Sequence, residues 1–596
     1  MKVKTKLTTR KRLPLLAILL LLVGAPLSFA AGPGNDARSA VVHGKFAKDL
    51  KYSNAKGMVD VIVQYRTTPT ATHYAKMASR GAFVKARLHG IHAAAFRIPA
   101  SAISQLENDP DVLYVTPDRP VQLHSIAQYE PYNSAVLADV AAQQYALDGT
   151  GIGVAVIDSG VSDHPDLHGS TGPSPSRVVY SQSFVTGDPT TADAYGHGTH
   201  VAGILGGNGA ASGAGSGYSM QFKGIAPNVN IVNLRVLDQS GSGTDSQVIA
   251  AIQQAIALKN QYNIRVINLS LGRPVFESYT LDPLCQAVEQ AWQAGIVVVV
   301  AAGNSGRDNS MHTDGFATVD APGNDPTVIT VGATRTFNSS TRVDDAIASY
   351  SSKGPTLLDH VVKPDIVAPG NRIISLLDSG STLDAQNPSL EVSPDACPLG
   401  SHCATKYFRL SGTSMSTPIV SGAVALMLQQ NPGLTPDSVK ARLMKTAWKG
   451  FGVYCQSFDI FNNLYNNQYD LFTYGAGYLD ISQALASNDV ANGAALSPTA
   501  YYNASNHTIS VQNTGSSNLA TSVIWGNSVV WGTSVVWGNS VLSANSVIWG
   551  NSVIWGNSVV WGDTTNQGFS VVWGQSVVWG QSNLTSAFSD GQDGEN

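Results

Sequence analysis

The feature that most constrains the fold is a series of short apolar runs from Gly151 onward. Each run ends in a loop of small or polar residues: GVAVID, NIVNLRVL, RVINLSL, IVVVVAAGN and TVITVGA. Helical periods lie between them, such as SQVIAAIQQAIALKN, in which Val248, Ile249, Ile252 and Ile256 share one face. Apolar strands that alternate with helices predict an α/β fold with a doubly wound, mostly parallel sheet covered on both faces. In such sheets, functional sites form at the carboxyl ends of strands.

The region before these runs predicts a smaller α+β module of ferredoxin-like type. Residues 58–66 alternate like a strand, a helical stretch follows, and residues 92–99 predict a second strand. A helix over 101–112 and a closing strand over 112–121 complete the module. The module ends near Arg119, and a polar segment leads from it to about Tyr129.

Both ends of the chain differ from this central part. Residues 1–30 contain six basic residues and then an apolar run, and they end with Ser28 and Ala30 before Ala31. This order predicts a secretory signal peptide and an extracellular protein. The alternative is a membrane anchor, but the run is shorter than the roughly 20 residues that a spanning helix needs. The net charge of −5 argues against nucleic acid as a partner.

The C-terminal part, residues 487–596, consists of a linker and a hexapeptide repeat of the form S-V-V-W-G-N. Eight tryptophans fall on one six-residue register: Trp525, Trp531, Trp537, Trp549, Trp555, Trp561, Trp573 and Trp579. A strict period indicates a β-prone repeat such as an array of stacked strands. A sticky tail without fixed structure is the alternative, because uncharged β-prone windows also aggregate. An ordered tryptophan face would suit contact with a cell surface or with another copy of the tail.

Three residues outside the repeat carry chemistry. Asp158 ends the run GVAVID, a position where Asp also caps turns. His197 lies in GHGTHVAGI, where an apolar helix begins, and His200 makes a metal pair the alternative. Ser414 lies in SGTSMSTP, and Pro418 is expected in the first helical turn, so the helix begins close to Ser414. A serine there is either a helix cap or a nucleophile whose own N–H can bind an oxyanion.

The segments VIDSGV, HGTHVAGI and SGTSMSTP, in the chain order Asp, His, Ser, resemble the three signature motifs of the subtilisin family, or subtilases. The resemblance extends over about residues 58–486. It implies that Ser414 is the nucleophile, that His197 is the general base and acid, and that Asp158 orients the imidazole. It also implies that Asn304, in VAAGNSG, donates to the oxyanion.

The resemblance also implies where a peptide substrate binds. Two segments match the family's substrate-binding edges: Gly241, Ser242 and Gly243, and Ser270, Leu271 and Gly272. A plain turn is the alternative for Gly241. The wall of the primary specificity pocket would consist of Ala301, Ala302 and Gly303. Such small walls, with no acidic residue standing out, predict a preference for apolar or aromatic side chains.

The same resemblance divides the chain. Residues 31–128, with a core at 58–119, would be a propeptide that inhibits the enzyme from within until cleavage near residues 119–130, and residues 129–486 would be the catalytic domain. A permanent accessory domain is the alternative for the N-terminal module. The sequence departs from the family pattern at Ser416, where Ala is usual, and in an insertion over about 377–408.

No cofactor is required by this chemistry. Asp166, in HPDL, matches a calcium ligand of many subtilases, but the usual partner loop is replaced by NGAASGAGSGYS. Calcium is therefore a candidate ion only. Four cysteines allow three pairings, of which a local Cys397–Cys403 disulfide is expected, and a zinc site with His402 is the alternative.

Together these features predict a secreted serine endopeptidase that hydrolyses proteins and peptides through an acyl-enzyme and is made as a self-processing zymogen. The alternative is a catalytically silent surface adhesin or scaffold that uses the tryptophan repeat.

Overall fold

The structure is a computed structural model that describes most of the chain from Lys45 onward. The described residues are 45–47, 50, 57–123, 129–130, 132–169, 175–310, 313–337, 339, 341–395, 404–451, 454–458, 464–491, 493–503, 508–512, 559–560 and 571–572. All of them belong to one compact unit, Lys45–Asn596. The predicted signal peptide, the predicted Cys397–Cys403 pair with His402, and most of the tryptophan repeat lie outside them. Within the described part, no helix is both long enough and apolar enough to cross a bilayer.

The small sheet module, residues 57–119, has one antiparallel sheet in the order β2–β3–β1–β4. Its elements are β1 (Met58–Tyr65), α1 (Ala71–Ser79), β2 (Phe83–Leu88), β3 (Ala93–Pro99), a 3₁₀ segment (Ala100–Leu106) and β4 (Val112–Pro117). The sequence prediction missed β2, in which five of six residues are exposed or half-buried, so its apolar signal is weak. The predicted closing strand is also wrong as one element, because it divides into β4 and a separate β5 (Pro120–Leu123).

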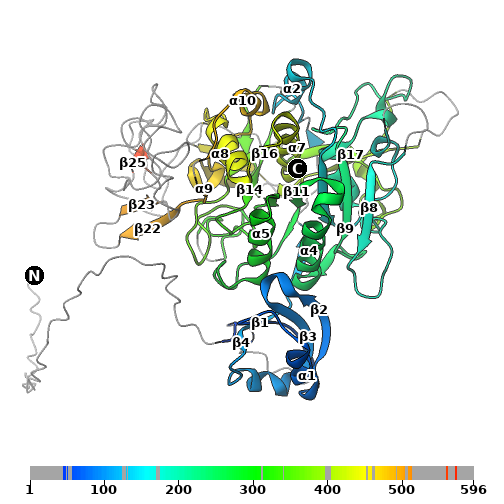
Figure 1. The fold of residues 1–596 in the computed structure, drawn as a ribbon. Helices are drawn as coiled ribbons and strands as arrows, with labels where there is room; N and C mark the ends of the chain where they lie inside the picture. Colours follow the sequence, from blue (N-terminus) through cyan, green and yellow to red (C-terminus); the bar gives the residue numbers. More distant parts are fainter. Residues whose placement is uncertain are drawn as a thin grey trace, which may run out of the picture. The chain divides into compact units, whose positions relative to one another are not determined.

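The large sheet module, residues 132–486, is built on an eight-stranded sheet in the order β15–β14–β13–β11–β7–β9–β8, with β16 paired to β14 (Figure 1). The strands are β7 (Gly153–Asp158), β8 (Val178–Ser183), β9 (Asn230–Arg235), β11 (Ile264–Leu269), β13 (Val297–Ala301), β14 (Ile329–Arg335), β15 (Ala346–Ile347) and β16 (Ile366–Pro369). All neighbours are parallel except β14 and β15. The predicted mostly parallel α/β sheet is confirmed.

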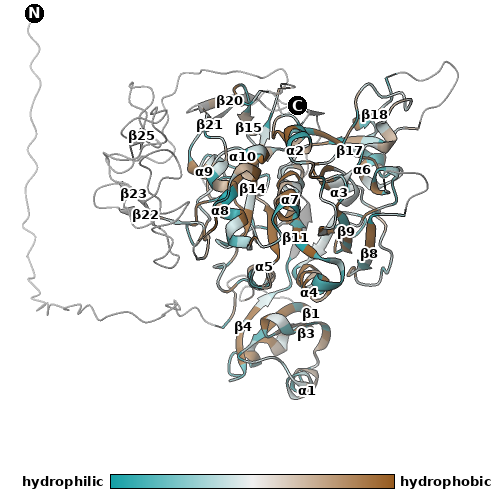
Figure 2. Ribbon diagram, turned by 45° about the horizontal axis from the view of Figure 1, so that its top comes forward, coloured by the Kyte–Doolittle hydropathy of each residue, from teal (hydrophilic) through white to brown (hydrophobic). Residues whose placement is uncertain are grey.

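Helices cover this sheet. Helix α4 (Asp245–Tyr262) contacts α5 (Pro283–Gln293), and α3 (His197–Gly206) contacts α7 (Thr413–Gln430). Every residue of β7, β13 and β14 is buried, so both faces of the sheet are covered. Figure 2 shows the hydrophobic colour along the central strands that it labels, β11 and β14. This burial explains why uninterrupted apolar runs, rather than alternating ones, marked the strands.

Smaller elements complete the module. A second sheet has the order β18–β19–β17–β6, from β6 (Tyr129–Glu130), β17 (Arg372–Leu376), β18 (Glu391–Val392) and β19 (Tyr407–Leu410). Further helices are α2 (Ala138–Tyr145), α6 (Thr382–Gln386), α8 (Pro436–Thr446), α9 (Leu471–Tyr474) and α10 (Ile481–Ala486). A three-stranded sheet has the order β10 (Ser242–Thr244), β5, β12 (Leu271–Gly272). Two hairpins pair β20 (Tyr454–Phe458) with β21 (Leu464–Gln468) and β22 (Thr499–Asn503) with β23 (Thr508–Gln512). In the repeat, β24 (Val559–Val560) pairs in parallel with β25 (Val571–Val572).

Candidate active site

The carboxyl end of β7 carries the first candidate residue. Asp158 is the last residue of this strand and is buried. Its Oδ1 accepts a hydrogen bond from the N–H of Ser159 at 2.7 Å and lies 2.8 Å from Nδ1 of His197. Because a carboxylate oxygen only accepts, Nδ1 carries the proton and Nε2 is left as the acceptor. This is the tautomer that a general base needs.

His197 is the first residue of α3 and is fully buried. Its Nε2 has no hydrogen-bond partner among the described residues. Helix α3 contacts both β7 and α7, the helix that carries Ser414. An imidazole held at one nitrogen and open at the other can take up and return a proton.

Ser414 is the second residue of α7. Its Oγ donates to the carbonyl of Ser270 at 3.0 Å, so the hydroxyl is engaged by the end of β11 in this state. Catalytic hydrogen bonds often form only when substrate is bound, so this geometry is compatible with a later bond to His197. Its main-chain N–H belongs to the first helical turn, which lacks intrahelical acceptors.

Pro418 affects the same helix start in a way that the sequence analysis did not predict. Helix α7 begins close to Ser414 as expected, but Pro418 is its sixth residue and lies beyond the first turn. A proline has no N–H for the carbonyl four residues before it, which here is that of Ser414. The Ser270 hydroxyl donates to this carbonyl at 2.8 Å instead. Ser270 therefore contacts Ser414 twice and fixes the nucleophile's main chain.

Asn304 lies three residues beyond β13. Its Oδ1 accepts from the N–H of Thr413 at 2.9 Å and from the Thr413 hydroxyl at 3.0 Å. These two bonds determine which end of the amide is oxygen and which is nitrogen. The buried Nδ2 has no hydrogen-bond partner among the described residues. A buried, oriented and unused donor beside Ser414 is the arrangement that an oxyanion site requires.

The predicted substrate-binding edges pair with the chain's own strand β5, which lies between β10 and β12. Ser242 and Gly243 pair with Gln122 and Val121, and Leu271 and Gly272 pair with Leu123 and Gln122, all antiparallel. Strand β5 is therefore an extended segment that pairs with one edge on each side, as a peptide substrate would.

Two residues of the predicted edges lie outside these pairs. Gly241 has a φ of 73°, and its N–H donates to the carbonyl of Asp238, so it is a turn residue. A Cβ at this position would lie 2.8 Å from the ring of Tyr195. Ser270 precedes β12 and contacts Ser414 instead.

Residues 149–477, more than half of the chain, match the Subtilase family. The chain belongs to the subtilase family. The prediction of a subtilisin-type serine peptidase is thereby confirmed at the level of the family.

Several relatives of this subtilase are named proteases. Serine protease AprX of Bacillus subtilis (strain 168) is 41% identical over 314 residues, which are 51% of this chain and 63% of that protein. Subtilisin E of the same organism is 33% identical over 415 residues, 69% of this chain and 88% of that protein. The fold matches fervidolysin of Fervidobacterium pennivorans with a TM-score of 0.54 and 21% identity, over 76% of this chain and 64% of that one.

Asp193 is a residue of the subtilase site that the sequence analysis missed. It is buried, and it accepts from the N–H groups of Gly196 and Thr199 and from the hydroxyl of Ser159 at 2.7 Å each. Burial raises its pKa, and these bonds oppose the rise. Asp193 thus satisfies the start of α3 and positions His197. In the sequence, the role of Asp193 is indicated by its position four residues before His197.

The insertion before the nucleophile packs against the same turn. The N–H groups of Thr382 and Leu383 in α6 donate to the carbonyls of Ala194 and Tyr195, and the Thr382 hydroxyl donates to the carbonyl of Gln239. Helix α6 therefore links the turn before His197 to the turn before β10. Residues of the insertion therefore lie beside both the turn before His197 and the turn before the predicted substrate-binding edge at β10.

The predicted wall of the primary specificity pocket has an acidic neighbour. A Cβ at Gly303 would lie 2.5 Å from Oδ2 of Asp320, and the N–H of Asp320 donates to the carbonyl of Ala302 at 3.0 Å. Asp320 is 5% exposed. No acidic residue stands out in the wall segment itself, because Asp320 lies 17 positions after Gly303 in the sequence.

The residues around Asp166 do not fit a calcium site as they are arranged here. Asp166 is buried, its Oδ1 accepts from the N–H of Ala211 at 2.6 Å, and its Oδ2 accepts from the Tyr407 hydroxyl at 2.7 Å. The Ser212 hydroxyl lies 2.7 Å from the same Tyr407 oxygen. Both carboxylate oxygens that calcium would need thus already bind donors of the protein.

Arg177 supplies positive charge to the same region. Its guanidinium donates to four main-chain carbonyls, those of Asp166, His168, Gly206 and Val229. Burial lowers its pKa to about 10, so it stays charged at neutral pH. Carbonyl oxygens around a cation, beside a carboxylate, are what a calcium site would offer. Here these carbonyls bind a side chain of the protein.

We expect the stability of this subtilase not to depend on calcium at Asp166. The unfolding midpoint should be the same in excess chelator and in millimolar calcium, measured by thermal denaturation. The variant Tyr407→Phe should instead lower the free energy of unfolding by about 1–3 kcal/mol, because it leaves a buried carboxylate oxygen without its donor. A midpoint that calcium raises in the unchanged protein, but not in Asp166→Asn, would contradict this expectation.

The other predicted metal and cysteine positions are structural. His200 is buried with Nε2 3.1 Å from the carbonyl of Phe408, and burial lowers its pKa to about 3, so it is neutral. Among the described residues, no three His, Cys, Asp or Glu side chains are placed to share a metal ion. Cys285 is a buried free thiol, and burial raises its pKa.

Proposed function

We propose that this subtilase is a serine endopeptidase that cleaves protein chains through an acyl-enzyme. The observation that carries the proposal is a pair of hydrogen-bonded units, one at the end of β7 and the start of α3 and the other at the start of α7. Asp158 holds His197 at 2.8 Å, and Thr413 holds Asn304 so that its amide donor is presented beside Ser414. An inactive adhesin is not favoured, because such a protein would have no need of these bonds.

Each group has a defined step in this chemistry. The Ser414 oxygen attacks the peptide carbonyl while His197 Nε2 takes the hydroxyl proton, and the amide Nδ2 of Asn304 stabilises the oxyanion. His197 then gives the proton to the leaving amine, and the C–N bond breaks. A water molecule attacks the acyl-enzyme in the same way, which releases the new carboxylate and restores Ser414. Asp158 keeps the imidazole oriented and stabilises its charged form.

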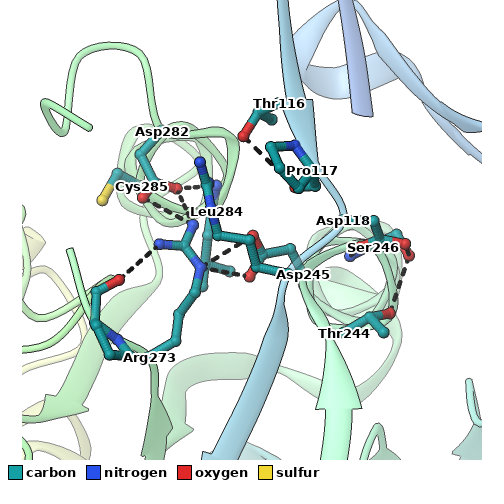
Figure 3. Close-up of polar contacts among 12 residues, drawn as sticks. Thr116, Pro117, Asp118, Thr244, Asp245, Ser246, Arg273, Asp282, Leu284 and Cys285 are labelled. Carbon is teal, nitrogen blue, oxygen red and sulfur yellow. Dashed lines mark hydrogen bonds and ion pairs between the residues drawn. The ribbon is translucent and has the colours of Figure 1, made fainter. Parts of the chain in front are cut away.

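We further propose that the small sheet module is an inhibitory propeptide. Strand β5 follows that module and occupies both substrate-binding edges, so a substrate cannot pair with them. The carboxylate of Asp118, just before β5, accepts from the N–H of Ser246 at 2.8 Å and from its hydroxyl at 2.5 Å, and so caps α4 (Figure 3). The permanent accessory domain stays as the alternative.

The remaining assignments follow from the same proposal. Residues 1–30 are proposed as a signal peptide, 31–128 as propeptide, 129–486 as the catalytic domain, and 487–596 as linker and repeat. Secretion, and attachment of the repeat to a cell surface or to itself, are parts of this proposal that await direct tests. Protein and peptide substrates and the propeptide are the proposed partners.

We expect the propeptide to be removed by a cut between Leu123 and Tyr129. Leu123 ends β5, which lies on the substrate-binding edges, whereas Tyr129 begins β6, which pairs with Arg372 of β17 in the large module. N-terminal sequencing and intact mass of the processed enzyme will locate the cut. A mature chain that starts before Pro120 or after Glu130 would contradict the proposed role of β5.

A further inference from the structure

Glu277, in the loop between β12 and α5, is a buried carboxylate that the peptidase chemistry does not use. Its two oxygens lie 2.6 and 3.2 Å from the guanidinium nitrogens of Arg119, a two-point contact. It also accepts from the hydroxyls of Tyr114 at 3.0 Å and Thr116 at 3.1 Å. All three partners precede β5 in the chain, so they leave together when the small sheet module leaves.

The neighbours of Glu277 make this a site that attracts cations. Arg273 is buried and is already bound on both sides, to Asp245 at 2.9 Å and to Asp282 at 2.9 Å (Figure 3). Two carboxylates therefore bind this one guanidinium of the large module, and Glu277 interacts with it only through its charge. Burial and the charge of Asp282 raise the pKa of Glu277, and Arg119 opposes that rise. Without Arg119 the cluster has an excess of negative charge.

An aromatic ring completes the surroundings of the guanidinium. The Arg119 guanidinium carbon lies 5.0 Å from the centre of the Phe276 ring. Arginine prefers such a combination of a carboxylate for two-point bonding and an aromatic face for stacking. Lysine suits both contacts less well than arginine, because its charge is concentrated on one nitrogen at the end of a flexible side chain.

Arg119 reaches this site because of its place in the bound strand. Its carbonyl accepts from the N–H of Asp245 at 2.9 Å, directly before β5 enters the two edges. Gln122, three residues later, pairs with Gly272. A substrate that pairs with the same edges will bring its own side chain from that position to Glu277.

We propose that Glu277 and Phe276 form a remote subsite that selects an arginine in the substrate, three residues N-terminal to the residue that pairs with Gly272. This rests on the proposed endopeptidase function and names part of its substrate specificity. In the precursor, Arg119 occupies the subsite. In the mature enzyme, a basic residue of the substrate takes its place.

The test uses the mature enzyme and an internally quenched peptide that copies residues 118–129. It compares arginine at position 119 with citrulline, which has the same shape without the charge, and with lysine and alanine. We expect KM to rise about tenfold for citrulline and alanine, with kcat little changed, because a two-point, charge-assisted contact is lost. The KM of the lysine peptide should lie between the KM values of the arginine and alanine peptides.

The enzyme variant Glu277→Gln should remove the difference between the arginine and citrulline peptides. Asp359→Asn is the matched control, because this carboxylate accepts from Ser278 and Tyr279 of the same loop and should leave the preference in place. The peptide series on the unchanged enzyme decides the question even if the Glu277→Gln precursor does not fold.

Equal KM values for the arginine and citrulline peptides on the unchanged enzyme would overturn the subsite alone. Loss of the preference in Asp359→Asn as complete as in Glu277→Gln would also overturn it, because the effect would then belong to the loop. Cleavage of no peptide at all would overturn the proposed function, and the subsite with it.

Discussion

The variant Ser414→Ala will leave the precursor at full length and unable to degrade an unstructured protein. Loss of the oxygen nucleophile should lower kcat by about 10⁶-fold, the size of this effect in subtilisin, a relative of this chain. Because self-processing uses the same nucleophile, the small sheet module should stay attached. Intact mass over time, together with hydrolysis of the unstructured protein, measures both effects.

Ser416→Ala is the matched control for that experiment. Ser416 lies in the same helix, and its hydroxyl donates to the carbonyl of Ala368 at 3.0 Å rather than to a residue of the site. This variant should process itself and retain activity. A Ser414→Ala chain that shortens by itself at the normal rate would show that another residue is the nucleophile.

The variant Asn304→Leu should lower kcat by about 10²–10³-fold and leave KM nearly unchanged; this range is the known cost of losing the equivalent donor in subtilisin. The buried Nδ2 of Asn304 is expected to donate a hydrogen bond only when the oxyanion forms, so its loss affects kcat and not KM. Steady-state kinetics on the quenched peptide will separate the two constants.

A companion variant tests how the amide is held. Thr413→Val removes the hydroxyl that donates to Asn304 Oδ1 but keeps the main-chain N–H that does the same. Its kcat should fall less than that of Asn304→Leu. If Asn304→Leu instead raises KM and leaves kcat as it was, Asn304 binds the ground state and is not the oxyanion donor.

The sequence predicted those parts of the fold that depend on local pattern. The sequence predicted β7, β9, β11, β13 and β14 because almost all of their residues are buried. A strand that is buried on both faces appears in the sequence as an unbroken apolar run. Strand β8, with the sequence VVYSQS, was missed because it is half exposed and carries polar residues. The division of the closing strand into β4 and β5 was missed as well, since β5 pairs with segments more than 100 residues away.

The candidate site shows the same limit. Asp158, His197, Ser414 and Asn304 stand in short motifs, so their meeting could be expected from the order of the motifs. Asp320 and Glu277 stand in none, and each becomes relevant only because a distant loop folds against Gly303 or Arg119. A carboxylate in a loop gives no signal of its own until its neighbours are known.

The position of Arg177 has a consequence for how stability responds to the surroundings. A bound ion stabilises a protein only as far as its free concentration exceeds its dissociation constant, so dilution or a chelator removes its contribution by mass action. A guanidinium that is covalently part of the chain cannot be diluted away from the four carbonyls it binds. The loops around Asp166 therefore keep their internal cation at any calcium concentration, as long as the pH stays below the lowered pKa of Arg177.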